Sequence, residues 1–165
     1  MKKNIILIGM PGSGKTTIGT ELSEKIGYGY IDSDSVIVAR EGMRLDELIA
    51  TVGREAFLDI EGKVNGELCA SRCVIATGGS VVYRASAMEH LKSLGRVVYL
   101  QLSYETIENR LGDLQKRGVA MKEGYTLLDL YKERTPLYEK YADITVSLDG
   151  KTIAESVDAL VEALR

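Results

Sequence analysis

The chain has 165 residues, a net charge of −3, 45% apolar residues and 27% charged residues. This length can bury a core without disulfides or metal, so we expect one domain over residues 1–165. The acidic balance argues against a nucleic-acid partner, and no apolar run has the length of a membrane span. Because the first residues show no signal-peptide pattern either, we expect a cytoplasmic protein. We also expect it to be a monomer.

Short β-rich runs alternate with helical patterns along the chain. The runs lie at residues 5–8, 28–31, 73–76, 97–102 and 144–146. Between them, apolar residues recur every three or four positions, as they do on one face of a helix. This alternation predicts an α/β fold, with a parallel sheet and helices on both faces.

The first β-rich run leads into Gly-Met-Pro-Gly-Ser-Gly-Lys-Thr at residues 9–16, the P-loop pattern in its required context. The glycines let backbone N–H groups surround phosphates. Lys15 supplies a positive charge for the outer phosphates, and Thr16 offers a hydroxyl group to Mg²⁺. The expected ligand is ATP with Mg²⁺. The candidate ATP-binding residues here are Gly12, Ser13, Gly14, Lys15, Thr16 and Thr17.

Asp32 and Asp34 follow the second β-rich run. If the strand continues to Asp34, its alternation places both carboxylates on one side, facing the P-loop. One would hold Mg²⁺ through water, and the other would accept a proton from an attacking hydroxyl group. The alternative is a helix N-cap, because Asp and Ser are favoured there, and capping and catalysis can coexist.

Two stretches are longer than a simple crossover requires. Residues 34–72 contain three helical patterns, and we expect this insertion to bind the second substrate. Residues 112–124 are polar and basic with weak periodicity, which is typical of a mobile lid. The lid includes Arg117, and Arg is suited to neutralising charge during phosphoryl transfer.

The third β-rich run ends in Thr-Gly-Gly-Ser at residues 77–80. Paired glycines let a ligand approach the backbone and bind its N–H groups, although a simple tight turn is the alternative. The candidate substrate contacts are Gly78, Gly79 and Ser80. Arg134 would capture a phosphate or carboxylate, although a surface charge on a helix is an equally good interpretation.

Cys69, Cys73 and His90 lack the spacing of a metal site. We expect both cysteines to be buried packing residues and His90 to have no metal-binding role.

The sequence resembles the shikimate kinase family over nearly its whole length. The shared motifs are the P-loop, Tyr-Ile-Asp-Ser-Asp at 30–34, Ile-Ala-Thr-Gly-Gly at 75–79, Arg-Thr-Pro-Leu-Tyr at 134–138 and Tyr-Ala-Asp at 141–143. The resemblance implies a three-layer P-loop sandwich with a five-stranded parallel sheet in the order 2-3-1-4-5, and a closing lid. It also implies ATP-dependent phosphorylation of a ring hydroxyl group, converting shikimate to shikimate 3-phosphate.

The resemblance also assigns roles to single residues. Asp34 is the implied base and hydroxyl binder, and Asp32 with Thr16 is the implied Mg²⁺ site. Arg134 is the implied carboxylate ligand of the acceptor. Arg110 is expected to stack on adenine. The implied catalytic set is Lys15, Asp34 and Arg117.

The chain departs from the family pattern at three places. The family motif Gly-Glu-x-x-Phe-Arg-x-x-Glu carries Arg where this chain has Leu58. The third glycine of the family is Ser80 here, and the Arg-Pro-Leu-Leu of the lid is Arg-Gly-Val-Ala at 117–120. Losing one of two carboxylate-binding arginines would weaken shikimate binding about tenfold to a hundredfold or more.

Three interpretations follow from these departures. Arg54 lies one turn before Leu58 on the same helix face, so its long side chain would reach the same carboxylate and preserve shikimate kinase activity. Alternatively, Leu58 and Ser80 mark a pocket for a different small hydroxylated metabolite. A third interpretation is a nucleotide-binding regulatory module without transfer activity, against which the retained catalytic set argues.

Overall fold

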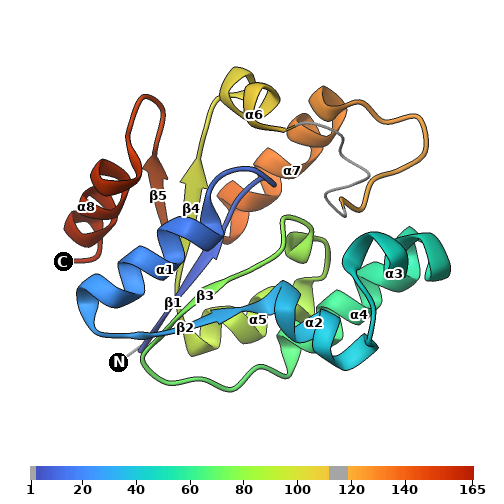
Figure 1. The fold of residues 1–165 in the computed structure, drawn as a ribbon, viewed down its shortest axis with the longest axis horizontal. Helices are drawn as coiled ribbons and strands as arrows, with labels where there is room; N and C mark the ends of the chain where they lie inside the picture. The colour runs from blue at the N-terminus through green and yellow to red at the C-terminus, as the bar shows by residue number, and fades with distance from the viewer. Residues whose placement is uncertain (1–2, 112–118) are drawn as a thin grey trace.

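Five parallel strands form the centre of the computed structural model, which describes residues 3–111 and 119–165 (Figure 1). The strands are β1 (Asn4–Ile8), β2 (Gly29–Asp32), β3 (Cys73–Ala76), β4 (Gly95–Gln101) and β5 (Ile144–Ser147). They pair in the order β2-β3-β1-β4-β5. Both the five predicted strands and the sheet order 2-3-1-4-5 are therefore confirmed.

Helices cover both faces of the sheet. They are α1 (Lys15–Ile26), α2 (Ser33–Glu41), α3 (Leu45–Val52), α4 (Arg54–Gly66), the short 3-10 helix η1 (Val81–Tyr83), α5 (Ala85–Leu94), α6 (Tyr104–Arg110), α7 (Leu127–Tyr141) and α8 (Ile153–Ala163). Helices α1 and α8 pack together on one face, and α5 and α7 contact β4 on the other. The three helical patterns predicted between the second and third strands are α2, α3 and α4.

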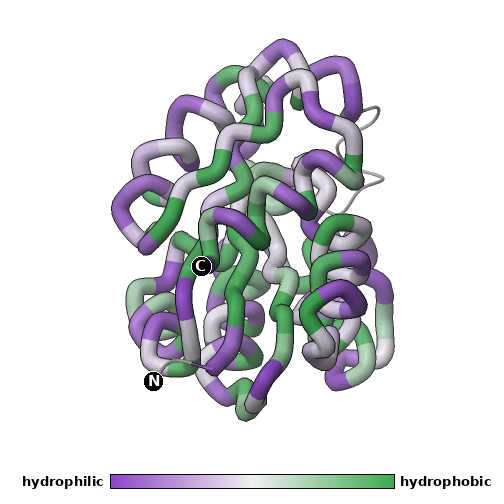
Figure 2. The backbone as a smooth tube through the Cα atoms, turned by 90° about the vertical axis from the view of Figure 1, so that its left-hand side faces the viewer, coloured by the Kyte–Doolittle hydropathy of each residue, from purple (hydrophilic) through white to green (hydrophobic). Residues whose placement is uncertain are grey.

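The central strand β1 shows why the sequence forms this sheet. All five of its residues are buried, because helices cover both faces. A strand buried on both sides has a continuous apolar run rather than alternation, and Ile5 to Ile8 form such a run. Figure 2 shows the same arrangement, with hydrophobic strands at the centre and hydrophilic stretches on the surrounding helices.

The prediction that both cysteines are buried is wrong. Cys69 is exposed, because α4 ends at Gly66 and the chain then runs along the surface to β3. Cys73 is only partly buried at the first position of that strand. The partly buried His90 contacts the carbonyl oxygen of Leu68 through Nε2 at 2.7 Å.

The described part of the chain shows neither a cluster of metal-binding side chains nor a membrane-spanning helix. Within residues 3–111 and 119–165, no three His, Cys, Asp or Glu side chains are grouped to hold a metal ion. No helix in this part of the chain is both long and apolar enough to cross a bilayer.

Asn4 joins three segments at the amino-terminal edge of the sheet. Its Nδ2 donates to the carbonyl oxygens of Ala70 and Leu94, each at 2.9 Å. Its Oδ1 accepts a hydrogen bond from the backbone N–H of Cys73 at 3.0 Å. The residue is buried, so water does not readily replace these contacts.

We expect Asn4→Ala to destabilise the fold, because it leaves three partly buried backbone groups without a partner. At roughly 1–3 kcal/mol for each such group, the free energy of unfolding should fall by about 3–5 kcal/mol in a urea titration. Asn109→Ala, at an exposed position of α6, is the matched control and should change it by less than about 0.5 kcal/mol. A loss below about 1 kcal/mol for Asn4→Ala would mean that water satisfies these groups.

Candidate active site

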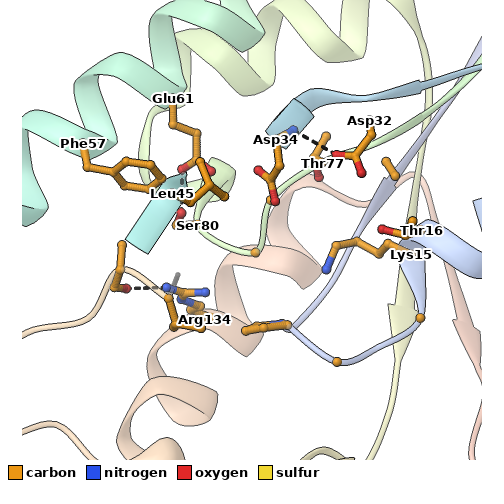
Figure 3. A pocket seen from close by; sticks show the side chains of 18 of the residues that line it. Lys15, Thr16, Asp32, Asp34, Leu45, Phe57, Glu61, Thr77, Ser80 and Arg134 are labelled. Carbon is orange, nitrogen blue, oxygen red and sulfur yellow. Dashed lines mark hydrogen bonds between the residues drawn. The ribbon is translucent and has the colours of Figure 1, made fainter. Parts of the chain in front are cut away.

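A cavity of about 270 Å³ lies at the carboxyl ends of the strands. This is the edge where parallel α/β sheets bind ligands. Its walls come from the loop after β1, the end of β2, the loop after β3, and side chains of α4 and α7. In Figure 3, the side chains of Lys15, Asp34, Glu61 and Arg134 surround a common space.

The P-loop forms the wall between β1 and α1. Gly12 has φ 80° and Gly14 has φ 92°, conformations that side chains disfavour. These glycines line the cavity together with Thr16 and Thr17, whereas Ser13 is buried beneath the loop. The amino-terminal end of α1 therefore borders the cavity, an arrangement that favours anions.

Lys15 folds back over the P-loop. Its Nζ donates to the carbonyl oxygens of Gly9 at 2.7 Å and Met10 at 2.9 Å, and to Ser13 Oγ at 3.4 Å. Burial lowers the pKa of Lys15 to about 8. A lysine at the amino-terminal end of α1 suits phosphate oxygens, because its charge adds to the preference of a helix N-terminus for anions.

The second strand ends earlier than the alternation argument assumed. β2 stops at Asp32, and Asp34 lies in the first turn of α2, so the helix N-cap alternative holds and strand alternation does not place the two carboxylates. Asp32 caps this helix, since its Oδ1 accepts hydrogen bonds from the backbone N–H groups of Asp34 at 3.0 Å and Ser35 at 3.4 Å. Both carboxylates nevertheless line the cavity, so capping and a place in the site coexist.

Asp34 and Glu61 meet above the backbone of Gly78. A methyl group on Gly78 would lie 2.6 Å from Asp34 Oδ1 and 2.6 Å from Glu61 Oε2. The two carboxylate oxygens are therefore separated by at most twice that distance. Only a glycine at this position lets both carboxyl groups approach the backbone.

Burial shifts the protonation of both carboxyl groups. Burial, aided by the charge of Asp32, raises the pKa of Asp34 to about 6. Asp34 Oδ1 is buried and accepts no hydrogen bond from a described residue. Burial raises the pKa of Glu61 to about 7, although Ser80 Oγ donates to its Oε1 at 2.6 Å and opposes the shift. Both groups are poised to exchange protons near neutral pH.

Arg134 is the cation at the far end of the cavity. Its helix α7 begins with a capping box at Thr126, and the arginine is only 1% exposed. The interpretation of Arg134 as a surface charge is therefore wrong. Its Nη2 donates to the carbonyl oxygen of Ala120 at 2.6 Å, and a methyl group on Gly79 would lie 2.9 Å from its Nη1. Among the residues described, no carboxylate forms an ion pair with it.

Leu58 and Arg54 both lie away from the cavity wall. Leu58 is buried in a second apolar cluster, formed by side chains of α2, α3 and α4 together with Ala120. The side chain of Arg54 forms ion pairs with Glu55 and, at 3.9 Å, with Glu133. Arg54 lies on the face of α4 that carries Phe57 and Glu61, but it does not line the cavity. The structure therefore does not bring Arg54 to the position expected for a direct acceptor contact.

Two arginine candidates remain, Arg110 and Arg117. Arg110, at the end of α6, donates from Nη1 to the carbonyl oxygen of Gly12 at 3.2 Å, which holds it beside the P-loop. Arg117 lies outside the described residues. Of the expected lid, residues 119–124 are described, and Val119 and Ala120 line the cavity.

Thr16 and Asp32 fit the chemistry of a Mg²⁺ site. Both line the cavity next to the P-loop. Asp32 uses Oδ1 as the helix cap, and its Oδ2 accepts no hydrogen bond from any described donor. One carboxylate and one hydroxyl group suit Mg²⁺, which takes its other ligands from water and substrate phosphates.

Two further residues were not predicted as functional from the sequence. Glu61 stands four residues after Phe57 in α4, and both line the cavity. The available signal was the family motif Gly-Glu-x-x-Phe-Arg-x-x-Glu, whose last position is Glu61 in this chain. Tyr83 in η1 accepts a hydrogen bond from Arg134, and no motif marks it.

We expect Gly78→Ala to lower kcat/KM for phosphoryl transfer about a hundredfold, because the new methyl group displaces Asp34 and Glu61 from their positions. Steady-state kinetics would measure this change. Gly66→Ala is the control, since a methyl group there meets nothing within 4 Å and should leave kcat/KM unchanged. Equal activity in Gly78→Ala and the wild type would show that the two carboxyl groups need not occupy these positions.

Glu61 should make the stability of the fold depend on pH. Its pKa rises from 4.5 to about 7 on folding, so the folded chain keeps a proton that the unfolded chain releases. Stability therefore falls as pH rises through this range, by roughly 3 kcal/mol in total. We expect Glu61→Gln to be more stable than the wild type at pH 8 by about this amount, and to differ little at pH 4.5.

Urea titrations at both pH values measure the difference, with the exposed Glu89→Gln as a control for charge loss. A stability difference between Glu61→Gln and the wild type that is independent of pH would contradict the raised pKa.

Comparisons with known proteins agree with this geometry. A family model described as "Shikimate kinase" matches residues 11–165. The shikimate kinase of Thermodesulfovibrio yellowstonii is 36% identical over 163 residues, which cover 97% of this chain and 94% of that protein. The structure of "Shikimate kinase from Acinetobacter baumannii in complex with shikimate" has a TM-score of 0.89 at 32% identity, covering 98% and 92% of the two chains. The shikimate kinase structure from Aquifex aeolicus has a TM-score of 0.83 at 30% identity, covering 98% and 95%. The chain belongs to the shikimate kinase family.

Proposed function

We propose that this chain transfers the γ-phosphoryl group of MgATP to a hydroxyl group of shikimate, forming shikimate 3-phosphate. The observation that carries this proposal is the buried guanidinium of Arg134, which has no carboxylate partner among the described residues. It shares one cavity with the carboxyl group of Asp34 and with the P-loop lysine Lys15. A hydroxylated carboxylate can contact both Arg134 and Asp34, while the phosphates of ATP contact Lys15.

The acceptor would be bound by complementary charge. A buried guanidinium is costly without a counter-ion, and a carboxylate supplies one with matching planar geometry. Gly78 and Gly79 leave room for a ligand against the backbone. Ser80 donates its hydroxyl hydrogen to Glu61, so this departure from the family is part of the acceptor wall.

The transfer step follows from the placement of Asp34. The acceptor hydroxyl oxygen forms a bond to the γ-phosphorus, the bond from that phosphorus to the bridging oxygen of ADP breaks, and the hydroxyl proton passes to Asp34. Lys15 and the P-loop N–H groups stabilise charge on the phosphate oxygens. From the lid, Arg117 would add a second positive charge.

The remaining assignments are also proposals. Thr16 and Asp32 would hold Mg²⁺, which when bound neutralises charge on the transferring phosphate. ATP would occupy the P-loop, with adenine beside Arg110. Residues 34–72 would bind the acceptor, and residues 112–124 would close over it. The monomeric state, the cytoplasmic location and the absence of a nucleic-acid partner stay predictions.

The decisive experiment is an ADP-release assay with MgATP, in which shikimate is compared with a panel of small hydroxy acids, polyols and amino alcohols. We expect saturable release with shikimate. Asp34→Asn should keep ATP binding and lose most of the turnover, because the base is gone while the P-loop is intact. Release with another compound but not with shikimate would support the reshaped pocket, and no release with any compound would support the regulatory module.

A further inference from the structure

Tyr83 contacts two arginine side chains at once. The guanidinium carbon of Arg54 lies 5.1 Å from the centre of its ring, and that of Arg134 lies 5.3 Å from the same centre. Both distances are within the range of a cation–π contact. Tyr83 ends η1, which packs against α4 and α7. The ring therefore connects the helix that carries Arg54 with the helix that carries Arg134.

The hydroxyl group of Tyr83 adds a directional contact to Arg134. Arg134 Nε donates to Tyr83 Oη at 3.3 Å, while Nη2 donates to the carbonyl oxygen of Ala120. Contacts at two of the three nitrogens orient the guanidinium plane, because its donors have a fixed geometry. The third nitrogen, Nη1, lies against Gly79 in the cavity wall.

Glu133 supplies a negative charge next to Tyr83 and Arg54. Its carboxylate lies 3.9 Å from Arg54 Nη2 and 3.9 Å from Lys122 Nζ. Burial would raise the pKa of this carboxyl group, but the neighbouring hydroxyl groups of Tyr125 and Tyr83, together with the nearby cations, lower it. The Tyr83 hydroxyl group accepts a hydrogen bond from Arg134 and also lies near the carboxylate of Glu133, so it stands between opposite charges.

We propose that Tyr83 is a positioning residue that orients Arg134 toward the carboxylate of the acceptor, and that Arg54 acts by holding Tyr83. This inference rests on the proposed function, in which Arg134 binds that carboxylate. It gives Arg54 a role different from the direct contact suggested by the sequence, and it involves a tyrosine that no motif marks. Bidentate recognition of a carboxylate depends on the orientation of the guanidinium plane, so a small rotation weakens it.

Tyr83→Phe is the sharpest variant, because it keeps the ring that contacts both arginines and removes only the hydroxyl group. We expect the KM for shikimate to rise about tenfold, while the KM for ATP and kcat at saturation change less than about twofold. Arg54→Ala should raise the KM for shikimate about threefold, because the loss of one cation–π contact loosens the ring. Unchanged KM values in both variants would overturn the proposal.

Tyr28→Phe is the matched control. Tyr28 is also partly buried, and the Arg72 guanidinium carbon lies 5.3 Å from its ring centre. It precedes β2 at the opposite edge of the sheet from the cavity and does not line it. We expect Tyr28→Phe to leave both KM values unchanged.

Measuring KM for the carboxamide of shikimate distinguishes a positioning role of Tyr83 from a general structural role. If Tyr83 acts through Arg134 and a carboxylate, the tenfold penalty of Tyr83→Phe should fall below about twofold with the amide. Equal penalties for the acid and the amide would overturn the proposal.

A second readout does not depend on the acceptor. In nitrogen-15 NMR spectra, the Nε–H signal of Arg134, assigned by its loss in Arg134→Lys, should exchange slowly in the wild type and at least tenfold faster in Tyr83→Phe. Equal exchange would overturn the inference even if the enzyme uses another acceptor. Wild-type inactivity toward shikimate, in contrast, would count against the proposed function alone.

Discussion

The buried positive charge of Arg134 is the constraint on which the acceptor end of the cavity depends. Its side chain is only 1% exposed, and neutral groups contact it where a carboxylate would be expected. Removing a guanidinium from water without a counter-ion is costly, so the surrounding chain must hold it by hydrogen bonds and ring contacts. Gly79 allows this approach, and Tyr83 and Ala120 complete the contacts. An anionic acceptor would supply the charge that the described residues do not.

Burial also makes the charged forms of three other side chains in the cavity unfavourable. Burial raises the pKa values of Asp34 and Glu61 and lowers that of Lys15, so each group is less stable in its charged form than it would be in water. Phosphates would favour the charged lysine, and an acceptor hydroxyl group would satisfy the unpaired oxygen of Asp34. Active sites commonly store such unfavourable interactions, which ligands then relieve. Burial of these groups therefore lowers the stability of the free chain, and a bound ligand would relieve this cost.

Sequence reasoning was most accurate where local pattern and fold agree. The P-loop, the five strands and the three helices of the insertion form as predicted, because glycine spacing and apolar periodicity act over short stretches. It left alternatives open where one residue could satisfy two local preferences. Asp32 ends β2 as a helix cap, and the chain turns before Asp34. The predicted burial of Cys69 was wrong, since exposure there depends on where α4 ends.

By itself, the sequence determined the fold class, the phosphate-binding loop and the identity of the groups at the strand ends. Their chemistry and order along the chain carry that information directly. Only the tertiary structure decided which distant side chains meet: that Glu61 faces Asp34 across Gly78, and that Arg54 contacts Tyr83 rather than the cavity. These contacts join helices far apart in the chain. Helix packing sets their distances, and no local periodicity encodes that packing.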